Sequence, residues 1–143
     1  MTTIIGLSGR KRAGKNSCYF LIKLLLDEDE TGQVVRVGFA DALKKMARDY
    51  RGWDGSKTGA GRKLLQDLGM SMREKDVDYW VKRAMAKIRR LEMEGAKVIV
   101  VTDVRFPNEV EALGKHGAFL WRVRRPVTET SVRDLHPSET ALD

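Results

Sequence analysis

The chain is poor in cysteine and in long apolar runs. Its one cysteine, Cys18, cannot form an internal disulfide, and its place in an apolar helical pattern favours a role as core filler. No apolar run approaches the roughly 18 to 20 residues that cross a membrane. The first residues also lack the apolar stretch and cleavage site of a secretory signal. We therefore expect a cytoplasmic protein that has no membrane partner.

Aromatic residues are scarce as well, at 7% of the chain, although the formal net charge is +7. This charge indicates anionic partners, which include nucleotides, nucleic acid and acidic proteins. A nucleic-acid-binding module usually presents aromatic side chains on which bases stack, and here the basic residues gather at loop junctions instead. A nucleic-acid-binding module therefore stays the less favoured alternative function, and we do not expect nucleic acid to be a partner.

The 143 residues suffice for one apolar core, which predicts a single domain over residues 1–143. Short β-branched runs alternate with amphipathic patterns. We expect strands at 2–8, 33–39, 97–102 and 118–123, and helices at 15–26, 41–50, 64–69, 77–91 and 107–116. This order predicts an α/β fold of three layers, with a mainly parallel sheet of about four strands flanked by helices.

Two segments stand apart from this alternation. Residues 40–95 read as a helical insertion that includes a mobile glycine-rich loop at 51–61, and residues 126–143 read as a polar C-terminal tail. Ligands of parallel α/β sheets bind at the carboxyl ends of the strands. Here the polar and basic junctions at those ends, residues 8–14, 39–41, 102–105 and 124–125, should meet at one edge.

The first junction carries a phosphate-binding pattern. Gly9, Gly14 and Lys15 fit G-x-x-x-x-G-K-[ST], in which backbone N–H groups curl around a phosphate and the lysine reaches its outer oxygens. Asn16 occupies the serine or threonine position, and Ser17 follows it. The alternative is a glycine-rich turn with solvated lysines, but the position between the first strand and the first helix favours phosphate binding.

An acid at the end of the neighbouring buried strand would hold magnesium directly or through water. Asp103, after the run VIVVT, fits this role. The alternative is a cap for the helix that begins near Pro107. Arg105 follows in the same crevice, and its alternative role is a surface salt bridge with Glu109.

Several segments, taken in order, resemble one enzyme family. These segments are GRKRAGKNS, FADALKKMA, GRKLLQDLG, DYWVKR, TDVRFPNE, VRRP and HPSETAL. They resemble the deoxynucleoside monophosphate kinases of the type that bacteriophages encode, a branch of the phosphate-loop (P-loop) kinases. That family commonly reads G-x-x-x-x-G-K-D-[ST], so Asn16 replaces its aspartate and Ser17 matches its hydroxyl residue.

The resemblance implies site residues, position by position. It implies that ATP is bound by Gly9, Lys11, Ala13, Gly14, Lys15, Asn16, Ser17 and Arg125, and that Ser17, Asn16 and Asp103 lie at Mg²⁺. It implies an acceptor pocket of Asp41, Lys44, Arg62, Gln66, Gly69, Trp80, Arg105 and Glu109. Catalytic roles fall to Lys15, Arg12, Asp103 and Arg105, and His136 and Glu139 match the family's H-x-[ST]-E signature. For Trp80, the alternative to stacking on a base in the acceptor pocket is a role as a core residue, because it lies beside an apolar helix stripe.

The activity that the resemblance implies is ATP-dependent phosphorylation of a nucleoside monophosphate, in particular a deoxy one, to the diphosphate. Mg²⁺ and ATP would be required, in the host cytoplasm if a phage encodes the protein. The alternative is a nucleotide-binding protein without turnover. Members of the family generally continue into another strand and a final helix, whereas this sequence stops at Asp143. We therefore also expect an exposed sheet edge, or its cover by a second copy in a homodimer.

Overall fold

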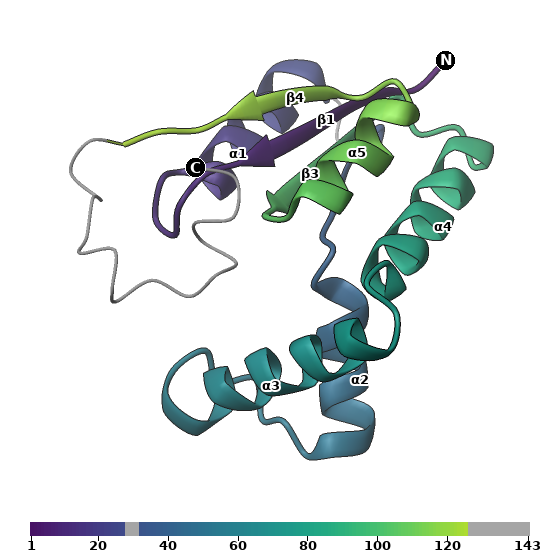
Figure 1. Ribbon diagram of the computed structural model, residues 1–143. Coiled ribbons are helices and arrows are strands. Elements are labelled where there is room, and N and C mark those ends of the chain that lie inside the picture. Colours follow the sequence, from purple (N-terminus) through teal and green to yellow (C-terminus); the bar gives the residue numbers. More distant parts are fainter. Residues whose placement is uncertain (28–31, 126–143) are drawn as a thin grey trace.

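The computed structural model describes residues 1–27 and 32–125 (Figure 1). Strands and helices alternate along most of this part of the chain. In order, the elements are β1 (Thr3–Ser8), α1 (Lys15–Leu26), β2 (Val34–Val37), α2 (Asp41–Arg51), α3 (Gly59–Lys75), α4 (Tyr79–Met93), β3 (Val98–Val104), α5 (Pro107–Lys115) and β4 (Phe119–Arg122). The predicted tail lies outside the described residues, and so do His136 and Glu139.

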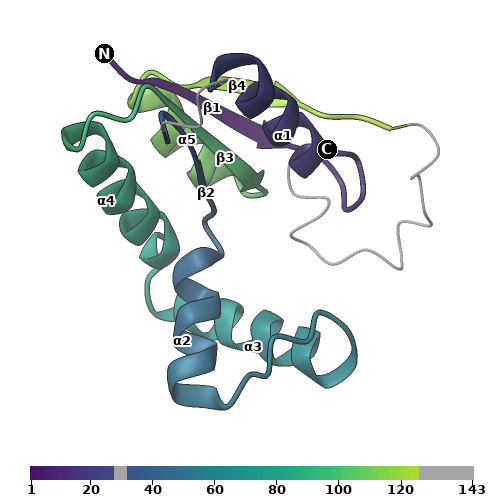
Figure 2. The same cartoon turned by 180° about the vertical axis from the view of Figure 1, so that it is seen from behind.

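The four strands form one parallel sheet in the order β2-β3-β1-β4. Ile5 of β1 is in register with Val100 of β3 on one side and with Phe119 of β4 on the other. Helix α1 covers one face of the sheet, whereas α4 and α5 cover the opposite face (Figures 1 and 2). The expected three-layer α/β P-loop kinase-like fold is confirmed.

The central strands are apolar because both of their faces are buried. Neighbouring residues of β1 point to opposite faces, so Ile4 packs with α4 and α5 while Ile5 packs with Tyr19 of α1. Tyr19 fills the face of α1 that packs on the sheet, whereas Leu25 is 71% exposed.

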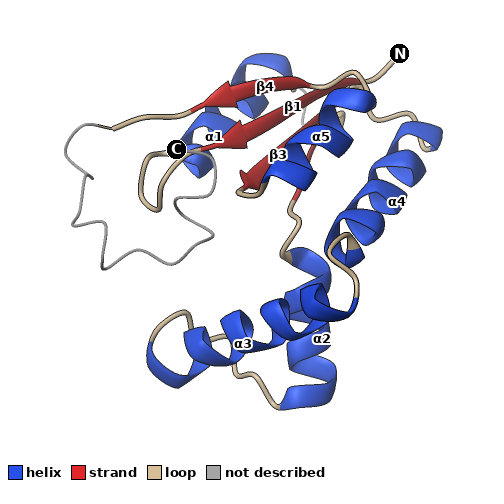
Figure 3. Cartoon of the chain, in the orientation of Figure 1, coloured by secondary structure: helices blue, strands red, loops and turns tan. Residues whose placement is uncertain are grey.

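Helices α2 and α3 extend away from the sheet and form what we call the helical arm, Asp41–Lys75 (Figure 3). The arm has its own small core, in which Ala47, Trp53 and Leu68 are buried. Helix α4 returns along the sheet and contributes Ile88 to the main core. The expected insertion at 40–95 therefore consists of an arm and a helix that packs on the sheet.

Helix α3 is longer than expected. The sequence pattern predicts its end at Gly69, but the helix continues to Lys75, and it begins at Gly59, inside the predicted loop. Gly69 is buried, and a Cβ there would lie 3.3 Å from Leu43 of α2. The glycine thus permits close helix packing rather than ending the helix.

The far edge of the sheet is open within the described part of the chain. There, β4 pairs with β1 alone, and Phe119, Leu120 and Trp121 are 41–61% exposed. None of the helices in this part of the chain combines the length and the apolar character that crossing a bilayer requires.

Candidate phosphate-binding site

The loop between β1 and α1 is tightly curled. Gly9, Arg12 and Gly14 all have positive φ, at 144°, 64° and 103°. A Cβ on Gly9 would lie 2.3 Å from the carbonyl oxygen of Val123, which follows β4. Glycine is therefore required at position 9 both by its conformation and by the close approach of a neighbouring backbone.

Lys15 lies across this curled loop. Its Nζ donates a hydrogen bond of 2.6 Å to the carbonyl oxygen of Gly9, and the side chain is partly buried. Helix α1 begins at Lys15 without a side-chain cap and without an acidic residue in its first turn. Its first N–H groups and its dipole therefore favour an anion at this point. Asn16 and Ser17 are exposed in the same turn, whereas Ala13 is buried and anchors the loop.

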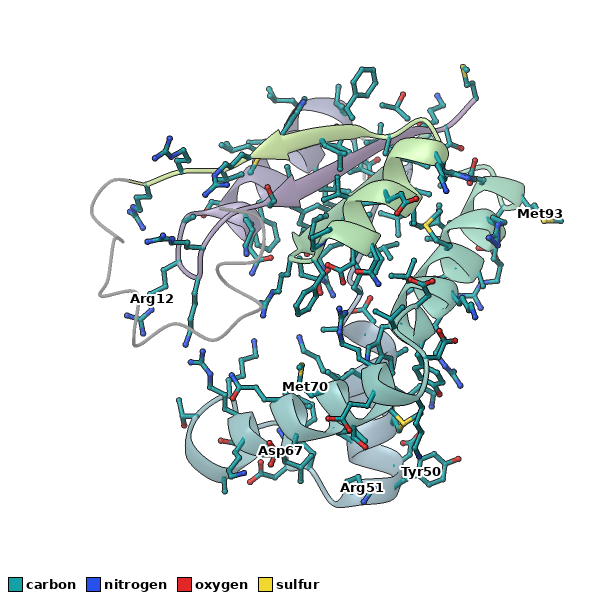
Figure 4. The ribbon with its side chains drawn as sticks, viewed as in Figure 1. Arg12, Tyr50, Arg51, Asp67, Met70 and Met93 are labelled. Carbon is teal, nitrogen blue, oxygen red and sulfur yellow. The ribbon has the colours of Figure 1, made fainter. Side chains whose placement is uncertain are left out.

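Helix α3 of the arm carries the predicted acceptor-binding residues Arg62 and Gln66. Arg62, Gln66 and Met70 are spaced by four residues on α3 and so share one helical face. Figure 4 shows Met70 on the side of α3 turned toward the sheet, and Arg12 projecting from the loop on the side where the arm lies. Gln66 lies one turn before Met70 and Arg62 two turns before it, so a position of both side chains toward the phosphate loop stays a prediction.

Asp103 lies near the end of β3, and both of its carboxylate oxygens accept backbone hydrogen bonds. Oδ1 accepts from the N–H of Phe39 at 2.7 Å, and Oδ2 accepts from the N–H of Ala40 at 3.0 Å. The alternative role of Asp103 as a cap for α5 is wrong. Its carboxylate instead holds the segment between β2 and α2.

Asp41 is the first residue of α2, and it bridges three elements. Its carboxylate accepts bonds from Gly38 N–H at 2.9 Å, from Arg36 of β2 at 3.1 Å and from Lys87 of α4 at 3.2 Å. Burial raises the pKa of Asp41, but these donors together outweigh burial and lower it. The cluster ties the arm to the sheet, so Asp41 has a structural role beside its predicted role in the acceptor pocket.

Lys44 lies one turn further along α2 and is half-buried. Burial lowers its pKa; the charge of Asp103 opposes this shift, and Lys57 and Arg36 add to it. Within the part of the chain that the structure describes, no side-chain hydrogen bond to Lys44 is found. A partly desolvated ammonium among other cations is suited to an anionic ligand.

Glu109 is buried, at 4% exposure, and it shapes the start of α5. Its Oε1 accepts the N–H of Arg105 at 2.7 Å and the N–H of Phe106 at 2.8 Å. Burial raises the pKa of Glu109 to about 7, although these two hydrogen bonds act in the opposite direction. The side chain fixes the turn that carries Arg105, and contact of Glu109 with the acceptor stays a prediction.

Trp80 and Gly69 interact with each other inside the protein. The indole N–H of Trp80 donates to the carbonyl oxygen of Gly69 at 3.1 Å, and Trp80 is only 5% exposed. A buried ring offers no face to a nucleotide base, so the core alternative for Trp80 holds. Gly69 is likewise buried at the contact between α3 and α2, so both residues have a packing role, and contact of either with an acceptor stays a prediction.

The two remaining arginines lie at strand ends. Arg105 follows β3 and its residue is exposed, while its backbone N–H binds Glu109 as described above. Arg125 lies shortly after β4. Between them, the N–H of Val123 donates to the carbonyl oxygen of Ser8 at 2.8 Å, directly before the phosphate loop. Both arginines therefore belong to the polar edge of the sheet that the sequence predicts.

Sequence reasoning missed two arginines. Arg36 of β2 donates to Thr102 Oγ1 at 3.0 Å and to Asp41, and Arg73 of α3 lies 3.7 Å from the ring centre of Phe106. The signal for Arg36 was available, because a charged residue interrupts the otherwise apolar strand QVVRVGF. Arg73 had no comparable signal, since basic residues in the last turn of a helix are common.

The described residues contain no group of three or more His, Cys, Asp or Glu side chains that could hold a metal ion by itself. Ser17, Asn16 and Asp103 nevertheless carry hydroxyl, amide and carboxylate oxygens, which are the ligand types that Mg²⁺ prefers. Mg²⁺ usually keeps few protein ligands and binds phosphate oxygens as well. This donor set therefore fits a magnesium ion that arrives with a nucleotide.

A parallel sheet, a curled loop after its first strand and a lysine at the start of the next helix define a P-loop kinase type of protein. The family model described as deoxynucleotide monophosphate kinase matches residues 21–143, and the chain belongs to this family. A curated relative, the uncharacterized protein ORF77 of Ictalurid herpesvirus 1 (strain Auburn), is 32% identical over 143 residues.

That alignment covers 99% of this chain and 59% of the herpesvirus protein, so the chain spans little more than half of its relative's length. A solved structure of a Mycobacterium tuberculosis APS kinase, the CysC Cys556Ala mutant, is 13% identical with a TM-score of 0.42. The match covers 98% of this chain and 92% of that one.

Proposed function

We propose that the chain transfers a phosphoryl group from ATP to a nucleoside monophosphate, in particular a deoxynucleoside monophosphate, and so forms the diphosphate. One observation carries the proposal: the loop closed by Lys15 faces the side of α3 on which Met70 lies, and Arg62 lies two turns earlier on the same helix. Two anion-binding groups that face each other suit a reaction between two phosphates. Membership of the deoxynucleotide monophosphate kinase family supports the same reaction.

ATP is the donor in this proposal, and the loop binds its phosphates. Backbone N–H groups from Gly9 to Gly14 and the first turn of α1 surround the phosphates, and the Lys15 ammonium exchanges the Gly9 carbonyl for phosphate oxygens. Lys11 and Ala13 belong to this loop. Arg12 reaches the transferring group, and Arg125 approaches from the end of β4.

Ser17, Asn16 and Asp103 are the residues that would hold Mg²⁺ together with the ATP phosphates. Bound there, the ion would neutralise charge on the phosphate oxygens. The protein contributes oxygen ligands on two rigid elements, α1 and β3. This division suits an ion that enters with its nucleotide.

The acceptor is bound by the arm and by the turn after β3. Arg62, Gln66 and Lys44 hold its phosphate, and Arg105 neutralises charge between donor and acceptor. An acceptor oxygen attacks the γ-phosphorus of ATP, a new P–O bond forms, and the bond to the β-phosphate oxygen breaks to release ADP. The attacking phosphate is already anionic, so a strong general base is unnecessary, and positioning with charge neutralisation provides the catalysis.

A coupled assay for ADP with ATP, Mg²⁺ and a panel of ribonucleoside and deoxyribonucleoside monophosphates tests this proposal. Formation of a nucleoside diphosphate, verified by chromatography, is the expected result. ATP binding in calorimetry without diphosphate formation from any monophosphate would instead identify a nucleotide-binding protein without turnover. Salt-sensitive binding to DNA with neither property would identify a nucleic-acid-binding module.

A further inference from the structure

The segment Gly38–Ala40, which we call the connector, joins the sheet to the helical arm. Its two consecutive amides, those of Phe39 and Ala40, donate to the two oxygens of Asp103 at 2.7 and 3.0 Å. Asp103 belongs to β3, the strand that pairs with β1, and the phosphate loop follows β1 directly. One carboxylate thus joins the strand beside the phosphate loop to the point where the arm begins.

Gly38 makes this arrangement sterically possible. A Cβ at position 38 would lie 2.8 Å from Oδ1 of Asp41 and 3.1 Å from Oδ2 of Asp103. Gly38 does not have a positive φ, so its backbone conformation does not require glycine. The missing side chain is needed because two carboxylates approach the connector closely.

The arm begins directly after the connector, so the connector determines where the arm's cations lie. Asp41 opens α2, and Lys44 follows within one turn, close enough for its pKa to respond to the charge of Asp103. Arg62 lies further along the same arm, because α3 packs on α2. A small rotation at the connector therefore moves both cations relative to the phosphate loop.

We propose that Asp103 is a positioning residue, which sets the angle of the helical arm through the connector amides and so places the acceptor's phosphate opposite the loop. This inference rests on the proposed kinase function and gives Asp103 a task besides any contact with magnesium. Asp41 cannot replace Asp103 in this role. Asp41 bonds to β2 and α4, whereas Asp103 connects the start of the arm to β3.

Two substitutions disturb the connector in different ways. Asp103→Asn removes the charge and one acceptor oxygen. Gly38→Ala leaves both carboxylates chemically intact, but its methyl group displaces Oδ1 of Asp41 and presses on Oδ2 of Asp103. The atoms that the new methyl group meets are the ends of side chains, which can shift, so the fold should survive. Gly114→Ala is the matched control, because a Cβ there meets nothing within 4 Å.

The experiment measures three quantities in each full-length variant: the amide NMR shifts of Phe39 and Ala40, the affinity for a nonhydrolysable ATP analogue with Mg²⁺, and the KM for the acceptor. In both connector variants we expect both amides to shift and the acceptor KM to rise roughly ten-fold or more, since small misplacements of bound groups are costly. Gly38→Ala should leave the analogue's affinity unchanged, and Gly114→Ala should change none of the three.

Unchanged amide shifts in Asp103→Asn would overturn the proposal. So would an unchanged acceptor KM in Gly38→Ala combined with a raised Mg²⁺ requirement in Asp103→Asn, because that pattern identifies a metal ligand only. Absence of turnover in the wild-type protein would overturn the proposed function instead. In that case the acceptor's dissociation constant in the presence of the ATP analogue replaces KM, and the same comparison between variants decides the role of Asp103.

Discussion

The ammonium of Lys15 lies 2.6 Å from the carbonyl oxygen of Gly9, so the lysine closes the phosphate loop upon itself. This bond holds the ammonium across the loop that, in the proposed mechanism, binds the phosphates of ATP. Lys15→Met keeps most of the side-chain stem and removes the charge. We expect weaker ATP binding in calorimetry and a turnover that falls on the order of 100-fold or more, as when one charge-stabilising donor is removed.

Lys45→Met is the matched control for this change. The Lys45 ammonium is exposed on α2 and pairs with Asp49 of the same helix at 2.9 Å. The two variants lose the same charge, but only Lys15 lies at the loop. Equal ATP affinity in the Lys15 variant and the wild type would show that the loop does not bind the nucleotide.

The buried carboxyl of Glu109 predicts a pH dependence of stability. Its pKa is raised from 4.5 to about 7, so between these values the folded chain keeps a proton that the unfolded chain has released. The contribution of this group is therefore complete below pH 4.5 and is lost as the pH rises through about 7. The span of about 2.5 pH units corresponds to about 3 kcal/mol of unfolding free energy at most.

Urea unfolding at several pH values measures this effect. Glu109→Gln keeps an acceptor oxygen for the amides of Arg105 and Phe106 but does not titrate, so its unfolding free energy should decline less between pH 4.5 and 7 than that of the wild type. Glu111→Gln, at an exposed ion pair with Lys115, should retain the wild-type slope. Parallel curves for the wild type and Glu109→Gln would contradict the raised pKa.

Much of the fold was predictable because the spacing of apolar residues along the sequence indicates which faces of helices and strands are buried. The continuous β-branched run at β3 and the steps of three and four along α4 specified buried elements, and the predicted bounds of α1 agree with the structure. The prediction failed at Gly69, where a glycine signal was taken as a helix end. Local propensity cannot show that another helix packs against that glycine closely enough to exclude a side chain.

The site was predictable in part. The loop from Gly9 to Lys15 is a local motif, so its conformation follows from nearby residues. The partners of Asp103 and Glu109 were not predictable, because a carboxylate in a sequence looks the same whether it faces a ligand or a backbone amide. Asp103 is separated from Phe39 by 64 positions, and only the folded chain brings the two together.

Trp80 should contribute to stability rather than to acceptor binding. Trp80→Leu removes a buried ring and its hydrogen bond to Gly69, and we expect a loss of about 3 kcal/mol in unfolding free energy. The acceptor KM, measured at a temperature where the variant is folded, should stay near the wild-type value. Trp121→Leu is the exposed aromatic control and should lower stability far less. A large rise in acceptor KM with unchanged stability would restore the base-stacking role.

Arg62 and Lys63 are neighbours on α3 that the helix turns to different sides, and this difference allows a test of the acceptor site. Lys63 pairs with Asp67 at 2.7 Å, one helical turn later, and both side chains are exposed. Arg62 is partly buried and lies one helical turn before Gln66, about 100° around the helix from Lys63. The two residues carry equal charge, so long-range attraction of an anion is nearly the same for both.

Replacing Arg62 with alanine should therefore raise the acceptor KM roughly 10- to 100-fold, because a charge-assisted hydrogen bond contributes about 1.5–3 kcal/mol. The affinity for ATP should change little, since in the proposed mechanism the loop, and not α3, binds ATP. Lys63→Ala should alter neither quantity by more than about two-fold, as expected for an exposed ion pair. If both variants raise the acceptor KM equally, the arm attracts the acceptor only through its net charge and Arg62 does not contact it. If only ATP affinity falls, the arm binds the donor, and the two nucleotides exchange places in the proposed mechanism.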